Sequence, residues 1–247
     1  MALRHELLRF LGIGPGHPYV IRLQEWRRTV LQTDGCLRDA YLSKEAKPKL
    51  QIGGGWHRLE GWLNTDIELI PEVMRMDATR PFPFEDATFE YIFTEHMIEH
   101  VTFQQGAFML RECHRVLRQG GVIRVVTPNL TTILGLYGTD LSSQQQEYLA
   151  WFCQTFVPEP CPRNAASTIN AMFRMWGHQF IYDESVLMVA LSAAGFSAIR
   201  RWSLGASGCP DLQNLENEQR YPKGLLDFES LVLEARKDGS ALTPVPS

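Results

Sequence analysis

The spacing of apolar residues changes near residue 49. From there onward, short apolar runs alternate with turns and with stretches of helical periodicity, which is the pattern of βαβ units around a mainly parallel sheet. The strands that this pattern predicts are 49–52, 62–65, 73–76, 89–94, 121–127, 197–204 and 229–235. The fold class is therefore predicted to be α/β.

Helices are predicted where apolar residues recur every three to four positions. One spans residues 103–117 and is expected to stop at Gly120-Gly121, because glycines commonly end helices. A second spans residues 184–194, with Asp183 as its N-cap. Residues 141–176 are rich in Gln, Trp and Met and show no strand pattern, so we interpret them as helical and irregular cover over the crevice.

The chain before residue 47 is predicted to be a helical extension, with helices over residues 5–11 and 20–33. Gly12-Ile-Gly-Pro-Gly16 imitates a glycine-rich cofactor loop, but it follows a helical pattern, and Asp34 beyond it is expected to lie in a turn. The predicted organisation is an N-terminal helical extension over 1–46, one domain over 47–236 and a disordered tail over 237–247.

Composition and charge narrow the function. The 247 residues are 45% hydrophobic, which suffices for a sizeable core, and their net charge is −4. This balance provides no electrostatic footprint for nucleic acid. Long apolar windows and a signal-peptide core are absent from the sequence, so we expect a cytoplasmic protein that does not bind a membrane. The five cysteines lack any Cys-x-x-Cys spacing and are expected to be buried thiols.

The glycines after the first predicted strand suggest a ligand site. Gly53, Gly54 and Gly55 lack the Cβ atoms that would block a sharp turn against a ligand. Asp66 ends the next predicted strand, and its carboxylate would face the same crevice, where it can accept hydrogen bonds from both hydroxyls of a ribose. The pair predicts a cofactor that contains adenosine, although three glycines after a short apolar run also form ordinary turns.

Seven short motifs follow one another in a recognisable order: Ile52-Gly-Gly-Gly55, Thr65-Asp66, Met76-Asp-Ala78, Pro81-Phe-Pro-Phe-Glu-Asp-Ala-Thr-Phe-Glu90, Glu95-His96, Arg115-Val-Leu-Arg-Gln-Gly-Gly121 and Ala194-Gly-Phe196. This order resembles that of the class I S-adenosylmethionine-dependent methyltransferases of the small-molecule type. The resemblance implies a Rossmann-like, seven-stranded, mostly parallel sheet with helices on both faces and an antiparallel last strand. It also implies S-adenosylmethionine as the cofactor.

The resemblance assigns roles to individual residues. Those implied to bind the cofactor are Gly53, Gly54, Gly55, Asp66, Ile67, Asp77, Ala78 and Glu95. The glycines would approach the methionine moiety and Asp66 would hold the ribose. Ile67 would lie against the adenine, Asp77 and Ala78 would meet the adenine edge, and Glu95 would stand beside the amino acid end of the cofactor.

Three features depart from the family pattern. Gln51 stands where many relatives have an acid, and His57 replaces the third glycine of the loop. Only thirteen positions separate Gly53 from Asp66, against about twenty in dinucleotide-binding proteins. The first crossover helix is therefore expected to be short or absent.

Two histidines and two glutamates lie in Thr94-Glu-His-Met-Ile-Glu-His100, after the fourth predicted strand. In one interpretation the two histidines are zinc ligands, because the stretch matches the His-x-x-Glu-His pattern of inverted zinc peptidases. That pattern, however, needs a long helix and a distant third ligand. A second interpretation is that His96 and His100 only cap or pack the turn. Our main interpretation assigns no metal.

The third interpretation makes these residues catalytic. The sulfonium of the cofactor is a strong electrophile, so catalysis consists largely of holding the nucleophile in line with the methyl group. An oxygen or nitrogen nucleophile can also need its proton removed, which suits a histidine. His96 or His100 is the candidate base, with Glu99 orienting one of them. His178 is a second candidate, or a structural residue that ties its loop to the next helix.

The main hypothesis is a methyltransferase that acts on an oxygen or nitrogen of a small-molecule or sugar-like acceptor, with no nucleic acid partner. One alternative is a metal-dependent hydrolase that uses His96 and His100. The other is a binding protein that keeps the fold without catalysis, which the shortened glycine loop would allow.

Overall fold

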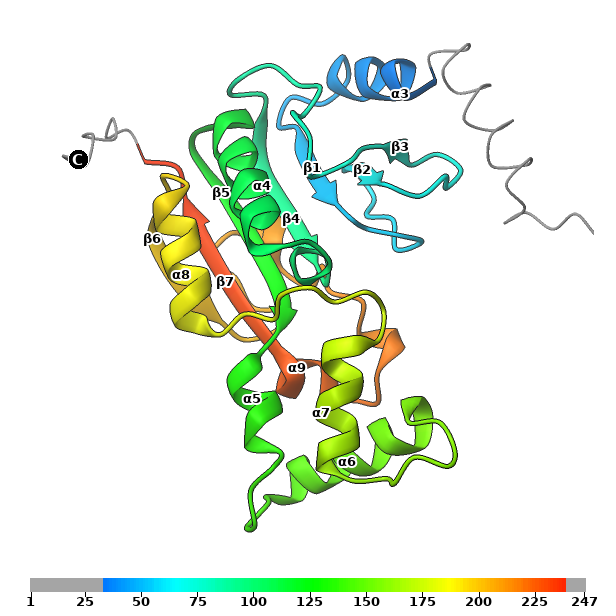
Figure 1. Cartoon of the computed structure of the whole chain (residues 1–247). Coiled ribbons are helices and arrows are strands. Elements are labelled where there is room, and N and C mark those ends of the chain that lie inside the picture. Colours follow the sequence, from blue (N-terminus) through cyan, green and yellow to red (C-terminus); the bar gives the residue numbers. More distant parts are fainter. Residues whose placement is uncertain (1–32, 239–247) are drawn as a thin grey trace, which may run out of the picture.

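A seven-stranded sheet organises the structure, a computed structural model that describes residues 33–238 (Figure 1). Its strands are β1 (Lys49–Ile52), β2 (Leu63–Asp66), β3 (Met74–Arg75), β4 (Phe89–Glu95), β5 (Leu117–Pro128), β6 (Ser197–Trp202) and β7 (Ser230–Arg236). They are ordered β3-β2-β1-β4-β5-β7-β6. Strands β1 to β5 run parallel to one another, and β7 runs antiparallel to both β5 and β6. The predicted fold class is confirmed.

The centre of the sheet is buried on both faces. Phe89, Ile92 and Phe93 of β4 are wholly inaccessible to solvent, and β5 is buried without interruption from residue 122 to 128. Continuous apolar runs are typical of such strands, which explains why the central strands could be located in the sequence. The order of strands reverses between β1 and β4, and ligands bind at the carboxyl ends of strands at such a point.

One face of the sheet is covered by α4 (Phe103–Val116) and α8 (Glu184–Ala193). Thr102 and Gln105 form a capping box at the start of α4, and Asp183 caps α8 through a bond from Val186 N, as predicted. The predicted stop at Gly120-Gly121 is wrong. The helix ends at Val116 because Leu117 pairs with Phe89 and begins β5.

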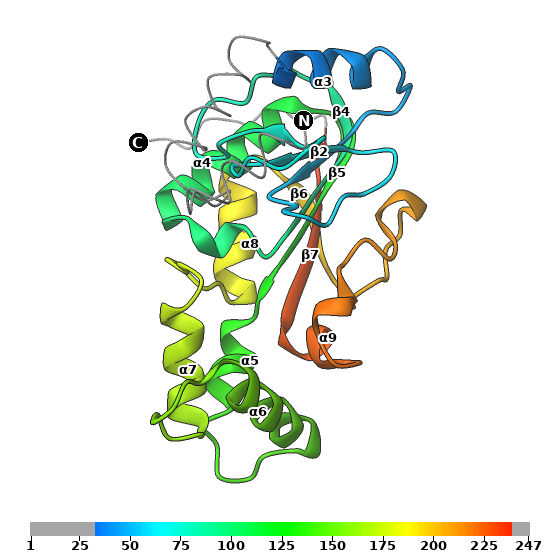
Figure 2. The same ribbon diagram turned by 90° about the vertical axis from the view of Figure 1, so that its right-hand side faces the viewer.

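The opposite face is covered mainly by the connection 203–229, seen from the side in Figure 2. It contains two short 3-10 turns, η2 (Pro210–Leu212) and η3 (Glu218–Arg220), and α9 (Leu225–Glu229). Arg124 of β5 anchors this connection: it is fully buried, its Nε lies 2.7 Å from Glu216 Oε1, and its Nη1 lies 2.8 Å from Glu234 Oε1. The connection is therefore held to the sheet by buried charge as well as by apolar packing.

Residues 130–174 extend beyond the carboxyl ends of β4 and β5 (Figure 1). They form α5 (Leu130–Gly135), α6 (Ser143–Phe156) and α7 (Ala165–Arg174). These helices share a core of their own that includes Tyr148, Phe152 and Met172. The predicted helical and irregular cover is thus a small aromatic-rich layer over the end of the sheet.

The N-terminal region is described only from α3 (Thr33–Leu42) onward. Asp34, predicted to lie in a turn, lies instead in the first turn of this helix, and its Oδ1 accepts a hydrogen bond from Arg75 N. The helices predicted over 5–11 and most of 20–33, the glycine loop at 12–16 and most of the tail lie outside the described residues. Within residues 33–238, no helix has the length and apolarity needed to cross a membrane.

Candidate active site

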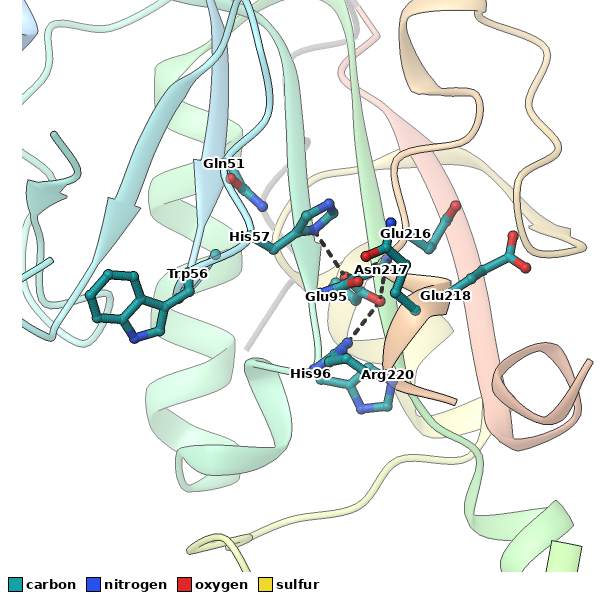
Figure 3. A pocket seen from close by; sticks show the side chains of 13 residues that line it. Gln51, Trp56, His57, Glu95, His96, Glu216, Asn217, Glu218 and Arg220 are labelled. Carbon is teal, nitrogen blue, oxygen red and sulfur yellow. Dashed lines mark hydrogen bonds and ion pairs between the residues drawn. The ribbon is translucent and has the colours of Figure 1, made fainter. Parts of the chain in front are cut away.

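A polar cavity of about 640 Å³ opens at the carboxyl ends of β1 and β4 (Figure 3). We call it the β1–β4 cavity. Its lining residues are Gln51, Gly53, Gly54, Gly55, Trp56, His57, Glu95, His96 and residues 216–220. It therefore brings the predicted glycines together with Glu95 and His96, from two neighbouring strands.

The glycine turn leads directly from β1 to β2 without a helix; residues 53–62 form only turns and extended chain, as the short spacing predicted. Gly53 has a φ of +68°, and a Cβ there would lie 2.4 Å from Met97 Cγ. A Cβ on Gly54 would lie 2.5 Å from Gln51 Cδ. Gly55 has a φ of +54° but open space around it. Glycine is required at positions 53 and 54 because a Cβ would collide with neighbouring side chains, and it is favoured at position 55 because the φ is positive.

Asp66 connects the end of β2 to this turn. Its Oδ2 accepts a hydrogen bond from Gly55 N at 2.7 Å, and its Oδ1 accepts one from Glu68 N at 2.8 Å. The neighbouring Ile67 is 57% exposed. Neither Asp66 nor Ile67 is among the residues that line the cavity, and neither are Asp77 and Ala78. Asp77 bonds to Thr79, and Ala78 belongs to the main core.

Glu95 holds the far wall of the β1–β4 cavity in place. Its carboxylate accepts hydrogen bonds from Arg220 Nη2 at 2.9 Å and from Asn217 N at 3.1 Å, as Figure 3 shows. His57 Nδ1 lies 3.8 Å from the same carboxylate. The sequence analysis missed residues 216–220, because this stretch is a polar connection with neither apolar period nor motif.

His96 lies between β4 and the next turn in an uncommon conformation. Its φ is +48°, its N donates to Val126 O, and its Nδ1 lies 3.2 Å from Glu99 Oε1. A positive φ is unfavourable for a residue with a Cβ and is found preferentially at functional sites. Burial by itself would lower the pKa of His96, but Glu99, with Glu229 and Glu95 farther away, raises this pKa above its usual value.

Glu99 is fully buried beside His96 and is fixed from the other side by the hydroxyl of Thr127, which donates to Oε2 at 3.0 Å. Burial acts to raise the pKa of Glu99, but His96 outweighs it and lowers this pKa. Glu99 is therefore a carboxylate held against one edge of the His96 ring, as the predicted orienting role requires.

A second cavity, of about 270 Å³, adjoins the first. We call it the aromatic cavity. Its lining residues are His96, Glu99, His100, Phe152, Phe156, Met172, Trp176, His178, Arg220, Tyr221 and Glu229. His96 and Arg220 line both cavities. All four residues predicted to be catalytic, His96, Glu99, His100 and His178, thus meet in the aromatic cavity.

His100 and His178 lie edge to face, with ring centroids 4.8 Å apart. His178 Nδ1 lies 2.6 Å from Met172 O, and burial lowers the pKa of His178. Gln179 N donates to Glu99 O at 2.7 Å. The histidines are therefore brought together by a contact between η1 (Ile98–His100) and the loop after α7. The zinc peptidase pattern would use His96 and His100, whereas the structure pairs His96 with Glu99.

Glu229 adds a second buried acid to the aromatic cavity. The hydroxyls of Tyr148 and Tyr221 both donate hydrogen bonds to its carboxylate, the latter at 3.0 Å. Burial raises the pKa of Glu229. Tyr221 and Glu229 were also missed as site residues, because Tyr221 lies in the polar connection and Glu229 was predicted only as the start of the strand 229–235.

The residues of the β1–β4 cavity fit S-adenosylmethionine. Three buried polar atoms that line it, Gln51 Oε1, His57 Nδ1 and His96 Nε2, have no hydrogen-bond partner among the described residues. Buried polar atoms normally have partners, so a polar ligand is expected here. The volume lies within the range of about 300–1,000 Å³ that is usual for ligand pockets.

Comparison with known proteins also indicates a methyltransferase. Residues 11–125, a little under half of the chain, match a family model described as a methyltransferase domain. No curated protein matches the sequence.

Solved structures with a similar fold include a SAM-dependent methyltransferase from Archaeoglobus fulgidus, at 15% identity and a TM-score of 0.43, covering 89% of this chain and 100% of the other. A SAM-dependent methyltransferase from Thermotoga maritima has 15% identity and a TM-score of 0.44, covering 87% and 98%. The Haemonchus contortus phosphoethanolamine N-methyltransferase 2 has 14% identity and a TM-score of 0.41, covering 84% and 52%.

Residues 11–125 are thus similar to a methyltransferase domain, and the seven-stranded sheet has the strand arrangement expected of that class. S-adenosylmethionine is the cofactor that this similarity implies.

Proposed function

We propose that this methyltransferase acts on an oxygen or nitrogen of a small-molecule or sugar-like acceptor bound in the aromatic cavity. The observation that carries the proposal is that His96 and Arg220 line both cavities. A methyl donor in the β1–β4 cavity and an acceptor in the aromatic cavity would therefore meet beside the His96 ring.

In this proposal the donor is held by residues of the β1–β4 cavity and its rim. Gly53, Gly54 and Gly55 leave room for the methionine moiety, and Asp66 accepts hydrogen bonds from the ribose. Glu95 stands beside the amino group, and Ile67, which is exposed, is free to cover the adenine. Bound there, S-adenosylmethionine supplies an electrophilic methyl group. Asp77 and Ala78 would meet the adenine edge, although they are not among the residues that line the cavity.

His96 acts as the base that accepts the proton of the acceptor. Its Nε2 has no partner among the described residues, while its Nδ1 faces Glu99. Glu99 orients the ring and stabilises the imidazolium that forms, and Thr127 fixes Glu99. A positioned base of this kind contributes about 10²–10⁴-fold to the rate. His100 and His178, farther from the donor, would line the acceptor.

Two measurements test the proposal. Titration calorimetry with S-adenosylmethionine and S-adenosylhomocysteine should show saturable binding of both, and Asp66→Ala should weaken it. Transfer of labelled methyl to a panel of hydroxyl and amine acceptors should then be lost in His96→Gln but retained in His114→Gln. His114 is a fair control because it packs on Phe196 and lines neither cavity. Equal activity of the two variants would overturn the role of His96.

A further inference from the structure

We propose that Glu99, His100 and His178 form a binding site for one divalent transition-metal ion in the aromatic cavity. Each offers one ligand atom, and the three atoms all lie within 4.8 Å of one another. The site does not depend on the proposed acceptor chemistry and can be tested without it. It departs from the sequence interpretation, which assigned no metal, because His178 comes from a distant segment.

The three side chains are held together by the backbone around them. Gln179 N and Phe180 N both donate to Glu99 O, at 2.7 and 3.2 Å. The side chain of Gln179 donates to His100 O at 2.9 Å. The segment that carries His178 is therefore bonded on both sides of the Glu99–His100 peptide. Because the protein itself makes this arrangement, little ordering would remain to be done by the ion.

His178 is prepared as a ligand by its second ring nitrogen. The 2.6 Å distance between His178 Nδ1 and Met172 O requires that Nδ1 carry the proton and donate it. The other nitrogen, Nε2, then has a free lone pair. Histidines that bind metals almost always donate their second nitrogen to a carbonyl or carboxylate in this way, which fixes the tautomer and the ring orientation.

Glu99 supplies the negative charge. Its side chain has no solvent exposure, and its Oε2 accepts the hydroxyl of Thr127. Oε1 lies 3.2 Å from His96 Nδ1 but makes no hydrogen bond of good geometry among the described residues. A buried carboxylate oxygen that is incompletely satisfied is costly, and a metal ion would complete its coordination.

The donor set indicates which ions would bind. Two imidazole nitrogens and one carboxylate oxygen suit Zn²⁺, Co²⁺ or Fe²⁺, whereas Mg²⁺ and Ca²⁺ prefer oxygen ligands. Bonds of about 2.0–2.1 Å would bring tetrahedral ligands to about 3.3 Å from one another. The ligand atoms already lie within 4.8 Å of one another, so small side-chain rotations would bring them to this spacing. Three protein ligands leave at least one position open to the cavity.

The test is a titration of the tag-free, metal-stripped full chain with Co²⁺ and, separately, with Zn²⁺ against a chelating dye. We expect one ion per chain, visible cobalt absorption typical of nitrogen ligands, and a rise in the melting temperature with saturating Zn²⁺. His178→Gln and His100→Gln should each lower the affinity by at least about 100-fold, since changes to residues behind the ligands already cost about 10–100-fold.

A control variant sharpens the result. His114→Gln, outside both cavities, should bind as the wild type does, and His178→Gln and His100→Gln should each bind as weakly as the other. The absence of stoichiometric binding to the wild type would overturn the proposal. So would binding that survives His178→Gln. Where a variant does not fold, the stoichiometry and the cobalt absorption of the wild type decide, because one ion held by nitrogen and oxygen ligands is what this site predicts and a thiolate site would absorb differently. Binding of S-adenosylmethionine, measured by calorimetry, does not depend on the metal site. A failure of the metal proposal can therefore be told apart from a failure of the proposed function.

Discussion

The two adjoining cavities share His96 and Arg220 but are built in different ways. The β1–β4 cavity is polar, and much of it comes from two short runs, 51–57 and 95–96, at neighbouring strand ends. The aromatic cavity is lined by residues of α6, α7, the loop after α7 and α9, from segments far apart in the chain. The proposed donor side therefore depends on strand ends, and the proposed acceptor side depends on how the cover packs.

The same contrast appears in the match to known proteins. The family model covers residues 11–125, which include the glycine turn, Asp66, Glu95 and the His96–His100 stretch. It does not reach His178, Arg220 or Glu229. The residues of the aromatic cavity after His100 therefore lie outside the match, as expected where function resides in sites added to a common fold.

The largest expected effect is on the wall of the β1–β4 cavity. Arg124→Met should lower the free energy of unfolding by about 3–5 kcal/mol, because Glu216 and Glu234 would remain buried without their counter-charge. Urea unfolding measures this. Adding Glu216→Gln and Glu234→Gln should restore most of the loss; no restoration would mean that packing of the guanidinium matters more than its charge.

His96→Gln tests the place where the cavities meet. We expect kcat to fall by about 10²–10⁴-fold while the dissociation constant of S-adenosylmethionine changes little, because Nε2 serves the acceptor. Steady-state kinetics and calorimetry give the two quantities. If kcat and the affinity for S-adenosylmethionine fell by the same factor, His96 would act on the donor side only.

Asp66→Ala should act on the donor side alone. The hydrogen bonds from the ribose to a carboxylate are each worth about 1.5–3 kcal/mol, so the cofactor affinity should fall by about 100-fold. Asp66 also holds Gly55 N, and Asp66→Asn, which keeps one acceptor oxygen, should lose less. Calorimetry on both variants ranks them, and unchanged affinity would refute the adenosine assignment.

The glycine turn allows a matched pair of variants. Gly55→Ala should cost about 1–2 kcal/mol of stability from its positive φ alone. Gly53→Ala should cost more, because its Cβ would also meet Met97. Thermal unfolding of the two proteins compares them, and a larger loss at Gly55 would contradict the described packing.

The smallest effect is expected at the edge of the aromatic cavity. Trp176 is 46% exposed and lines only this cavity. Trp176→Leu should raise the KM for the acceptor by a factor of about ten, equivalent to about 1.4 kcal/mol, and leave cofactor binding unchanged. Acceptor saturation curves measure it; a change in cofactor affinity instead would show that the cavities are not separate.

The strands and the glycine turn were predictable because their signals are local. Buried parallel strands produce uninterrupted apolar runs, and a glycine turn must follow β1 where Met97 approaches. Errors arose where a tertiary pairing overrides a local preference. Gly120-Gly121 did not end the helix, because Leu117 pairs with Phe89 first. Asp34 lies in a helix although its surroundings suggested a turn.

The acceptor side could be predicted only in part. His178 was recognised as a candidate, but nothing in the sequence relates it to Glu99, which lies 79 positions earlier. Arg220, Tyr221 and Glu229 lie in or beside a connection without periodicity, so no pattern singled them out. Their roles depend on contacts to Glu95, His96 and two tyrosine hydroxyls that exist only after folding.

The sequence by itself thus determined the sheet, the glycine turn and the acid that ends β2, because each is specified by residues adjacent in the chain. The tertiary structure alone decided that Glu95 fixes the 216–220 wall, that His96 serves two cavities, and that His178 meets Glu99 and His100. These are relations between side chains on separate segments. They follow from the packing of the cover against the sheet, which is a property of the whole fold rather than of any one stretch.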